Sequence, residues 1–165
     1  MWEVPTNRLM RYFLLTLLLF FTACSTKSYE QTKTKLLTIK TKQFRFSDIA
    51  YLRHTNSELE LELFVAGQVF KKITINHLIC VSDEGCMSKE HFNEEFLDAN
   101  YSQNLLQNVL LGKPLLSGEN LQKTDNGFEQ HLRSESYDIE YRVAAKEIYF
   151  KDRKNHILIK LKELQ

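Results

Sequence analysis

The sequence has little of several things that mark specialised classes of protein. Its 165 residues include only three cysteines, two prolines and five glycines, and the formal net charge is +1. Three cysteines are too few for a miniprotein built on disulfides. A net charge so close to zero argues against a general nucleic-acid binder, which would carry a strong basic excess. The 12% of aromatic residues argue against a wholly disordered chain, and the length favours one domain.

Common catalytic and metal-binding motifs are also absent. The chain contains no H-E-x-x-H, G-x-S-x-G or phosphate-loop pattern. No spacing between histidines places any two of them together; the five are His54, His77, His91, His131 and His156. We therefore expect no enzyme, no cofactor and no metal ion. A triad assembled in space from distant residues stays an alternative, because triads are recognised by geometry.

One long hydrophobic run is present, and it lies at the N-terminus. Arg8 and Arg11 precede the uncharged run 12–21 (YFLLTLLLFF), which is too short to span a bilayer. A basic start, such a run and small residues after it are typical of a secretory signal peptide, which we predict over 1–23. A buried core helix is the alternative. A translation start at Met10 would give a more compact signal.

The residues that follow this run, Phe21-Thr22-Ala23-Cys24, resemble the lipobox of bacterial lipoproteins. The resemblance implies cleavage before Cys24, a diacylglyceryl group on its thiol and an acyl group on its amine. Two or more acyl chains anchor a protein stably in a membrane. We therefore expect a lipid-anchored protein of the bacterial cell envelope. As a separate expectation, we place it in the outer membrane, facing the periplasm; the inner membrane is the alternative. A secreted protein with an incidental Cys24 is the alternative.

The mature chain divides into a short polar segment and one domain. Residues 24–35 are expected to form a lipidated tether, and an unrecognised first strand or helix is the alternative. The domain, 36–165, shows alternating polar and apolar residues, most clearly in 58–63 (ELELEL). There the leucines share one face, and the glutamates are expected to be solvated. Similar alternation predicts about nine strands, with Ala66-Gly67 as one hairpin turn.

Helical spacing is confined to the middle of the domain. Ser88 and Ser102 are expected to cap two short helices, of which the second ends at Gly112, before Pro114, and 117–127 is expected to be a loop. Each strand has a polar face, which is typical of an antiparallel sheet. The sequence therefore predicts an α+β, mainly antiparallel β fold. We expect a strongly curved sheet or half-barrel whose concave face is covered by two short central helices.

Cys80 and Cys86 are the cysteines that remain after Cys24 is assigned to the lipid. A pair of this kind usually forms a disulfide in the oxidising compartment to which the protein is exported, and we predict one. Thiol-redox chemistry, a metal site that includes His77 and His91, and two free buried thiols are the alternatives.

The apolar residues of strands and helices have two interpretations. They form either an ordinary solid core or the lining of a cavity for acyl chains, and packing density decides between the two. We take these residues as the lining of such a cavity: Leu59, Leu61, Leu63, Ile73, Ile75, Phe92, Phe96, Leu106, Val109, Leu110, Ile139, Tyr141, Phe150, Ile157 and Ile159.

The layout resembles the LolA/LolB group of periplasmic lipoprotein carriers. The resemblance is carried by the lipobox at Cys24, by hairpins through Leu63 and Ile75, and by the helix end 109–114 (VLLGKP). It implies an eleven-stranded half-barrel, closed by helices, that takes up the acyl chains of lipoproteins. We expect a membrane-anchored carrier or receptor that binds lipids or lipoproteins. The alternative is a non-catalytic structural or assembly lipoprotein that docks onto an envelope protein complex.

Overall fold

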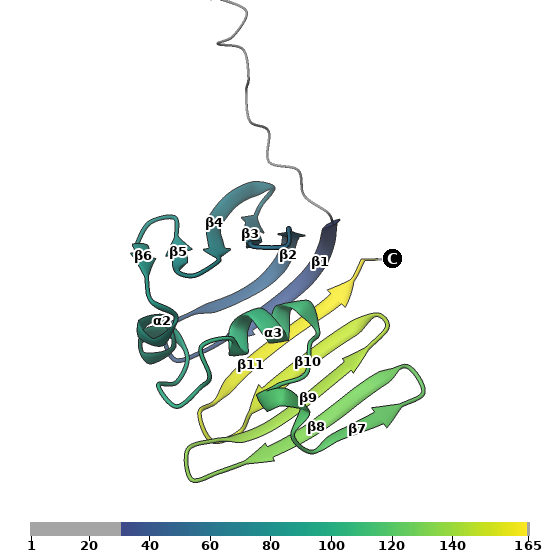
Figure 1. Ribbon diagram of the computed structural model, residues 1–165. Helices are drawn as coiled ribbons and strands as arrows, with labels where there is room; N and C mark the ends of the chain where they lie inside the picture. Colours follow the sequence, from purple (N-terminus) through teal and green to yellow (C-terminus); the bar gives the residue numbers. More distant parts are fainter. Residues whose placement is uncertain (1–30, 165) are drawn as a thin grey trace, which may run out of the picture.

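The computed structural model describes residues 31–164, so the predicted signal peptide, Cys24 and the first part of the predicted tether lie outside the described residues. The described chain is mainly antiparallel β, with eleven strands in one open sheet and two α-helices between β6 and β7 (Figure 1). The first six strands are β1 (Gln31–Lys40), β2 (Arg45–His54), β3 (Leu59–Val65), β4 (Gln68–Ile75), β5 (Ile79–Val81) and β6 (Gly85–Met87). The helical segment contains α2 (Lys89–Phe96), α3 (Leu105–Leu111) and the 3-10 turn η2 (Leu116–Gly118). The last five strands are β7 (Leu121–Thr124), β8 (Gly127–Arg133), β9 (Asp138–Ala144), β10 (Glu147–Asp152) and β11 (Ile157–Glu163).

The sheet consists of two series of hairpins joined through the first and last strands. Its order is β6-β5-β4-β3-β2-β1-β11-β10-β9-β8-β7. Strand β1 pairs with β11 from Lys35 opposite Glu163 to Lys40 opposite Leu158. The chain therefore enters and leaves the sheet at the same end, in its central strands, whereas the helical segment connects the two edge strands (Figure 1).

The alternating segment 58–63 forms most of β3, as predicted, but its polar face is not solvated throughout. Leu61 and Leu63 are buried on the core face. Glu60, on the other face, is only 1% exposed because Arg53 and Lys72 cover it, with N–O distances of 2.8 and 2.6 Å. The expectation of a fully solvated acidic face is therefore wrong at Glu60, since cations from the two neighbouring strands pair with this carboxylate.

The β3–β4 turn follows the predicted chemistry. Ala66 and Gly67 both have positive φ angles, of 51° and 79°, and Val65 pairs with Gln68 on either side of them. Two positive φ angles in a two-residue loop match the twist of a hairpin. Gly67 adopts this conformation without the cost that a side chain would bring.

Three expectations about the strands are corrected. Strand β1 begins at Gln31, so the predicted tether overlaps it over 31–35, where polar residues pair with β2. Strand β6 was missed because three residues are too few to show an alternation. Strand β7 lies within the expected loop 117–127; it is a short edge strand that pairs only with β8. The sheet thus has eleven strands rather than about nine.

The helix boundaries follow from their caps, with one correction. The Ser88 side chain accepts a hydrogen bond from the backbone N–H of His91 at 3.2 Å, which confirms it as the cap of α2. Helix α3 ends as predicted at Gly112, which has a left-handed φ of 65°. Its N-cap is Asn104 rather than the predicted Ser102, and no side-chain hydrogen bond is formed there.

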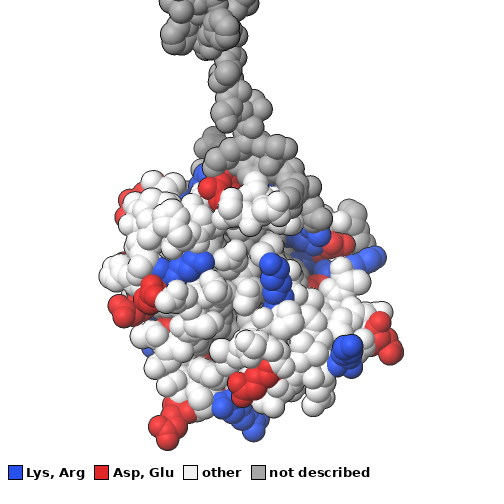
Figure 2. Space-filling model, in the orientation of Figure 1, with Lys and Arg blue, Asp and Glu red and all other residues white. Residues whose placement is uncertain are grey.

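Buried side chains of the helices and of the sheet belong to one hydrophobic cluster. From the helices, Phe92, Leu106 and Val109 join it, each at most 5% exposed. On the face of the molecule shown in Figure 2, charged side chains are spread out and are separated by broad uncharged areas.

Candidate functional site

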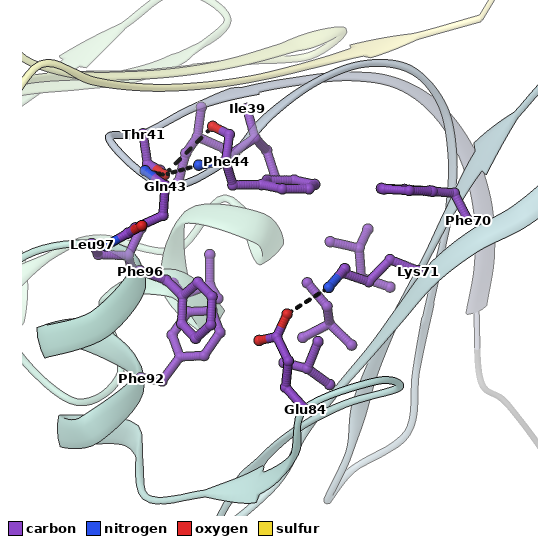
Figure 3. Close-up of a pocket in the computed structure, with 15 residues that line it drawn as sticks. Ile39, Thr41, Gln43, Phe44, Phe70, Lys71, Glu84, Phe92, Phe96 and Leu97 are labelled. Carbon is purple, nitrogen blue, oxygen red and sulfur yellow. Dashed lines mark hydrogen bonds and ion pairs between the residues drawn. The ribbon is translucent and has the colours of Figure 1, made fainter.

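A cavity of about 260 Å³ lies between the sheet and the helical segment. Its volume is just below the roughly 300–1,000 Å³ that is typical of ligand pockets. Its walls are mostly apolar and come from β1, β3, β4, β5, β11, α2 and α3 (Figure 3). The lining residues are Ile39, Thr41, Gln43, Phe44, Leu61, Phe70, Lys71, Ile73, Val81, Glu84, Phe92, Phe96, Leu97, Leu106 and Ile159.

The cavity contains part of the set that the sequence pointed to. Six of the fifteen residues line it: Leu61, Ile73, Phe92, Phe96, Leu106 and Ile159. The other nine do not line this cavity, and each is at most 2% exposed; they are Leu59, Leu63, Ile75, Val109, Leu110, Ile139, Tyr141, Phe150 and Ile157. The single set therefore divides between the wall of this cavity and buried positions elsewhere, of which Leu110, Ile139 and Ile157 border other cavities.

The turn between β1 and β2 supplies a wall that the sequence reasoning missed. The Thr41 hydroxyl accepts hydrogen bonds from the backbone N–H groups of Gln43 and Phe44, at 3.3 and 3.0 Å. This turn holds the Phe44 ring stacked beside that of Phe46, at a centroid distance of 6.4 Å. The Phe44 ring also stacks beside that of Phe70, again at 6.4 Å (Figure 3). Phe44 is an aromatic residue in an otherwise polar turn, and this feature of the sequence could have indicated a role in the cavity wall.

A charge pair stands at the side of the cavity. Lys71 Nζ and Glu84 Oε1 are 2.7 Å apart, and their side chains are 16% and 34% exposed (Figure 3). Glu84 lies in the turn between β5 and β6, and this hairpin is closed by a disulfide between Cys80 and Cys86. The predicted disulfide is confirmed, and it holds the turn that carries Glu84.

The rim of the cavity is apolar where the β3–β4 hairpin reaches the solvent. Phe70 lines the cavity and is nevertheless 50% exposed, while Val69 and Val65 of the same hairpin are 53% and 46% exposed. Contiguous exposed apolar residues on a soluble domain mark sites of interaction with proteins, membranes or ligands. The apolar lining of the cavity therefore reaches the solvent at Phe70, and the same hairpin exposes two further apolar side chains, Val65 and Val69.

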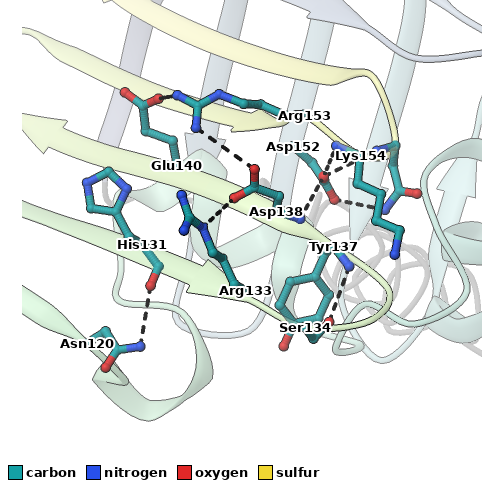
Figure 4. A network of polar contacts seen from close by, with 11 residues as sticks. Asn120, His131, Arg133, Ser134, Tyr137, Asp138, Glu140, Asp152, Arg153 and Lys154 are labelled. Carbon is teal, nitrogen blue, oxygen red and sulfur yellow. Dashed lines mark hydrogen bonds and ion pairs between the residues drawn. The ribbon is translucent and has the colours of Figure 1, made fainter.

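A second polar cluster, around Asp152, is structural. The fully buried Asp152 carboxylate accepts hydrogen bonds from the Tyr101 hydroxyl at 2.6 Å and from the Asn155 side chain at 2.8 Å. It also accepts one from the Asp138 backbone N–H at 3.1 Å (Figure 4). Burial alone would raise the pKa of Asp152, but these hydrogen bonds hold that pKa below its ordinary value. Burial and the bond to the carboxylate raise the pKa of Tyr101, which stays a neutral donor.

The chemistry of the cavity is that of an apolar binding site. Its lining offers one hydroxyl, one amide and one ion pair among apolar side chains. Within residues 31–164, no three His, Cys, Asp or Glu side chains are grouped so that they could hold a metal ion. A ligand would therefore be held chiefly by removal of its apolar surface from water.

Comparisons with known proteins give no family for this chain. No protein-family model matches it, and no curated protein matches it in sequence. In the described range 31–164, no helix is long and apolar enough to cross a membrane.

Proposed function

We propose that this chain is a lipid-anchored protein of the bacterial cell envelope that binds an acyl chain of a lipid or lipoprotein. The observation that carries the proposal is the apolar cavity between β1, β3, β4 and α2, whose aromatic rim residue Phe70 is half exposed. Six residues that the sequence pattern selected for such a site line it. The role of the chain is that of a carrier or receptor.

We infer that α2 and α3 cover the concave face of a curved half-barrel. The support is that Phe92 and Phe96 of α2 and Leu106 of α3 share one cavity with sheet residues. In addition, α3 contacts β10, which is separated from β3 and β4 in the sheet by the central strands β1 and β11. The sheet also has the eleven strands that the resemblance to the LolA/LolB group implies.

The proposed anchor is Cys24, which lies outside the described residues. It rests on the lipobox resemblance of 21–24. The Cys80–Cys86 disulfide supports export, because disulfides persist in oxidising compartments such as the periplasm. The outer membrane, facing the periplasm, is the proposed location.

The energetics suit reversible capture. Each methylene group that leaves water for an apolar site contributes about 0.8 kcal/mol, and the ordering of chain and ligand offsets part of that gain. No charged side chain needs to be desolvated at the centre of the site, since Lys71 and Glu84 already pair with each other. Such a site holds an acyl chain and also releases it, as transfer to a membrane requires.

The test is photo-cross-linking of the full chain in growing bacteria. A benzophenone analogue of phenylalanine replaces Phe96, in the cavity wall, or Phe128, a partly buried phenylalanine on β8 that does not line the cavity. We expect mass spectrometry of the irradiated protein to find adducts with acyl lipids at position 96 and none at position 128.

Two outcomes would contradict the proposal. One is that a folded protein, with its disulfide intact, yields no acyl adduct at position 96. The other is that the analogue, placed instead at Val69 on the exposed hairpin, captures one large envelope protein while the cavity stays free of lipid. That second result would favour the assembly lipoprotein.

A further inference from the structure

A second cavity lies between α3 and the end of the sheet at which β1 begins. Its volume is about 430 Å³. We call it the lysine cavity and define it by Lys33, Lys35, His54 and Lys113 in its walls and by the apolar side chains of Leu110 and Ile148. In Figure 1 this end of the sheet is where β1 begins and where β11 ends.

The lysines of β1 occupy positions that normally belong to the core. Side chains alternate between the two faces of a strand, so Lys33 and Lys35 share the face of the buried Leu37 and Ile39. His54 stands likewise on the core face of β2, two residues after the buried Leu52. Lys35 and His54 each have a paired strand on both sides, so protection of a sheet edge does not explain their charges, whereas Lys33 lies beyond the end of β11 and is exposed.

The lysine cavity has an excess of positive charge. Among residues 31–164, no Asp or Glu lines it. Glu163 stands just outside it, paired with Lys35 at 2.7 Å and close enough to Lys33 to interact with its charge, and Lys33 and Lys113 form no direct ion pair within the described range. Three lysines and this one carboxylate leave a net charge of +2. The C-terminal end of α3 opposes this charge by about half a unit. More than one positive charge is therefore left to face a ligand, which points to an anion.

The apolar wall narrows the choice of anion. Leu110 and Ile148 place hydrocarbon opposite the amines, and the volume lies within the roughly 300–1,000 Å³ of ligand pockets, more than a simple inorganic anion needs. Lysine binds phosphate groups as a point charge without demanding a fixed orientation. We propose that the lysine cavity binds the phosphate ester group of an anionic amphiphile.

The position in the chain favours a lipid headgroup as the source of this phosphate. The proposal rests at this point on the proposed function, that is, on an anchor at Cys24. Only eight residues separate Cys24 from Lys33, which limits their separation to about 30 Å. The lysine cavity would then remain within reach of the membrane surface, whereas a free phosphate ester would reach it from solution.

The test measures the accessibility of individual lysines in the full chain. The protein is placed in bilayer nanodiscs of phosphatidylglycerol or of phosphatidylcholine, and the rate of acetylation of each lysine is followed by mass spectrometry. A third sample holds phosphatidylcholine nanodiscs with added glycerol 3-phosphate. Lys123, exposed on β7 and outside the cavity, is the internal reference.

In phosphatidylglycerol we expect Lys33 and Lys113 to react about tenfold more slowly than in phosphatidylcholine, with Lys123 unchanged. Protection by glycerol 3-phosphate would also support the site and would identify a soluble ester as its ligand. Substitution Lys113→Gln should abolish the protection of Lys33, and Lys113→Arg, which keeps the charge, should retain it. Both substitutions are at an exposed position outside the helix.

Two results would overturn the proposal. Equal protection of Lys123 would show general attraction to an anionic surface rather than a site. Absence of protection in both the phosphatidylglycerol and the glycerol 3-phosphate samples would remove the site altogether. Neither result bears on the acyl cavity, which position 96 tests separately, and the glycerol 3-phosphate sample does not depend on lipidation of Cys24.

Discussion

The substitution Asp152→Asn tests how the helical segment is fastened to the sheet. Tyr101 lies directly before α3, and its hydroxyl bonds the Asp152 carboxylate at the end of β10. The same carboxylate accepts backbone N–H groups from Asp138, Lys154 and Asn155 at 3.1, 2.9 and 3.2 Å. All of these groups are donors, so the site requires an acceptor at both oxygens.

The magnitude follows from this donor count. An amide at position 152 retains one acceptor oxygen and places an NH₂ group where the Asn155 side-chain NH₂ already donates, at 2.8 Å. Asn155 cannot turn its amide without losing its hydrogen bond to the Ser136 carbonyl at 3.0 Å. Hydrogen bonds to a charged group contribute about 1.5–3 kcal/mol and neutral ones about 0.5–1.5 kcal/mol. We therefore expect a loss of about 2–4 kcal/mol in the free energy of unfolding.

The assay is urea unfolding of both proteins at several pH values. The pKa of Asp152 is lowered in the folded state, so its carboxylate contributes stability above the unfolded pKa of about 3.9. That contribution is lost as the pH falls through the folded pKa. The difference in the free energy of unfolding between wild type and Asp152→Asn should therefore stay constant between about pH 6 and about pH 8. It should become smaller below about pH 4.

Tyr101→Phe is the matched variant for Asp152→Asn, because it changes the other side of the same hydrogen bond. Tyr101→Phe removes one donor and leaves the carboxylate with its backbone partners, so it should cost less than Asp152→Asn, about 1.5–3 kcal/mol. The reasoning is refuted if Asp152→Asn is as stable as wild type at neutral pH. It is also refuted if the difference is the same at pH 3 and pH 7.

Two further predictions concern stability. Gly112→Ala should lower the free energy of unfolding by about 1–2 kcal/mol, because φ is 65° and the new Cβ would stand 3.2 Å from Ile148 Cδ1. Gly67→Ala is the control for backbone strain alone, because Gly67 has a φ of 79° and open space around it. Equal losses of stability for the two variants in urea unfolding would exclude crowding at Ile148. Replacing Cys80 and Cys86 together by serine should lower the free energy of unfolding by about 2 kcal/mol, as the closure of a short loop predicts. An unchanged midpoint in guanidinium chloride, relative to the oxidised protein, would count against this account.

The elements that could be predicted from the sequence depend on interactions between residues that are close in the chain. The strict alternation of 58–63 specifies a strand because only a period of two separates its leucines from its glutamates. Ser88 and Gly112 specify helix ends because each satisfies backbone groups in its own turn. The Cys80–Cys86 disulfide could be predicted because only these two cysteines remain once Cys24 is assigned to the lipid, and because a protein expected to be exported meets an oxidising compartment. The same logic failed at β6 and β7, which are too short to show a period and exist through pairing with a neighbour.

What each face and pocket contains was decided only by the tertiary structure. Leu61 and Leu63 are the same residue type on the same face of β3, yet Leu61 lines the apolar cavity and Leu63 is completely buried in the core. At Leu61 the cavity wall opposite the sheet includes Phe92 and Phe96 of α2 and Leu106 of α3, which lie far along the chain. Lys33 and Lys113 share a cavity for the same reason, although 80 positions separate them. Sequence period determines which side of a strand a residue occupies, and the packing of distant elements determines whether that side is solid or hollow.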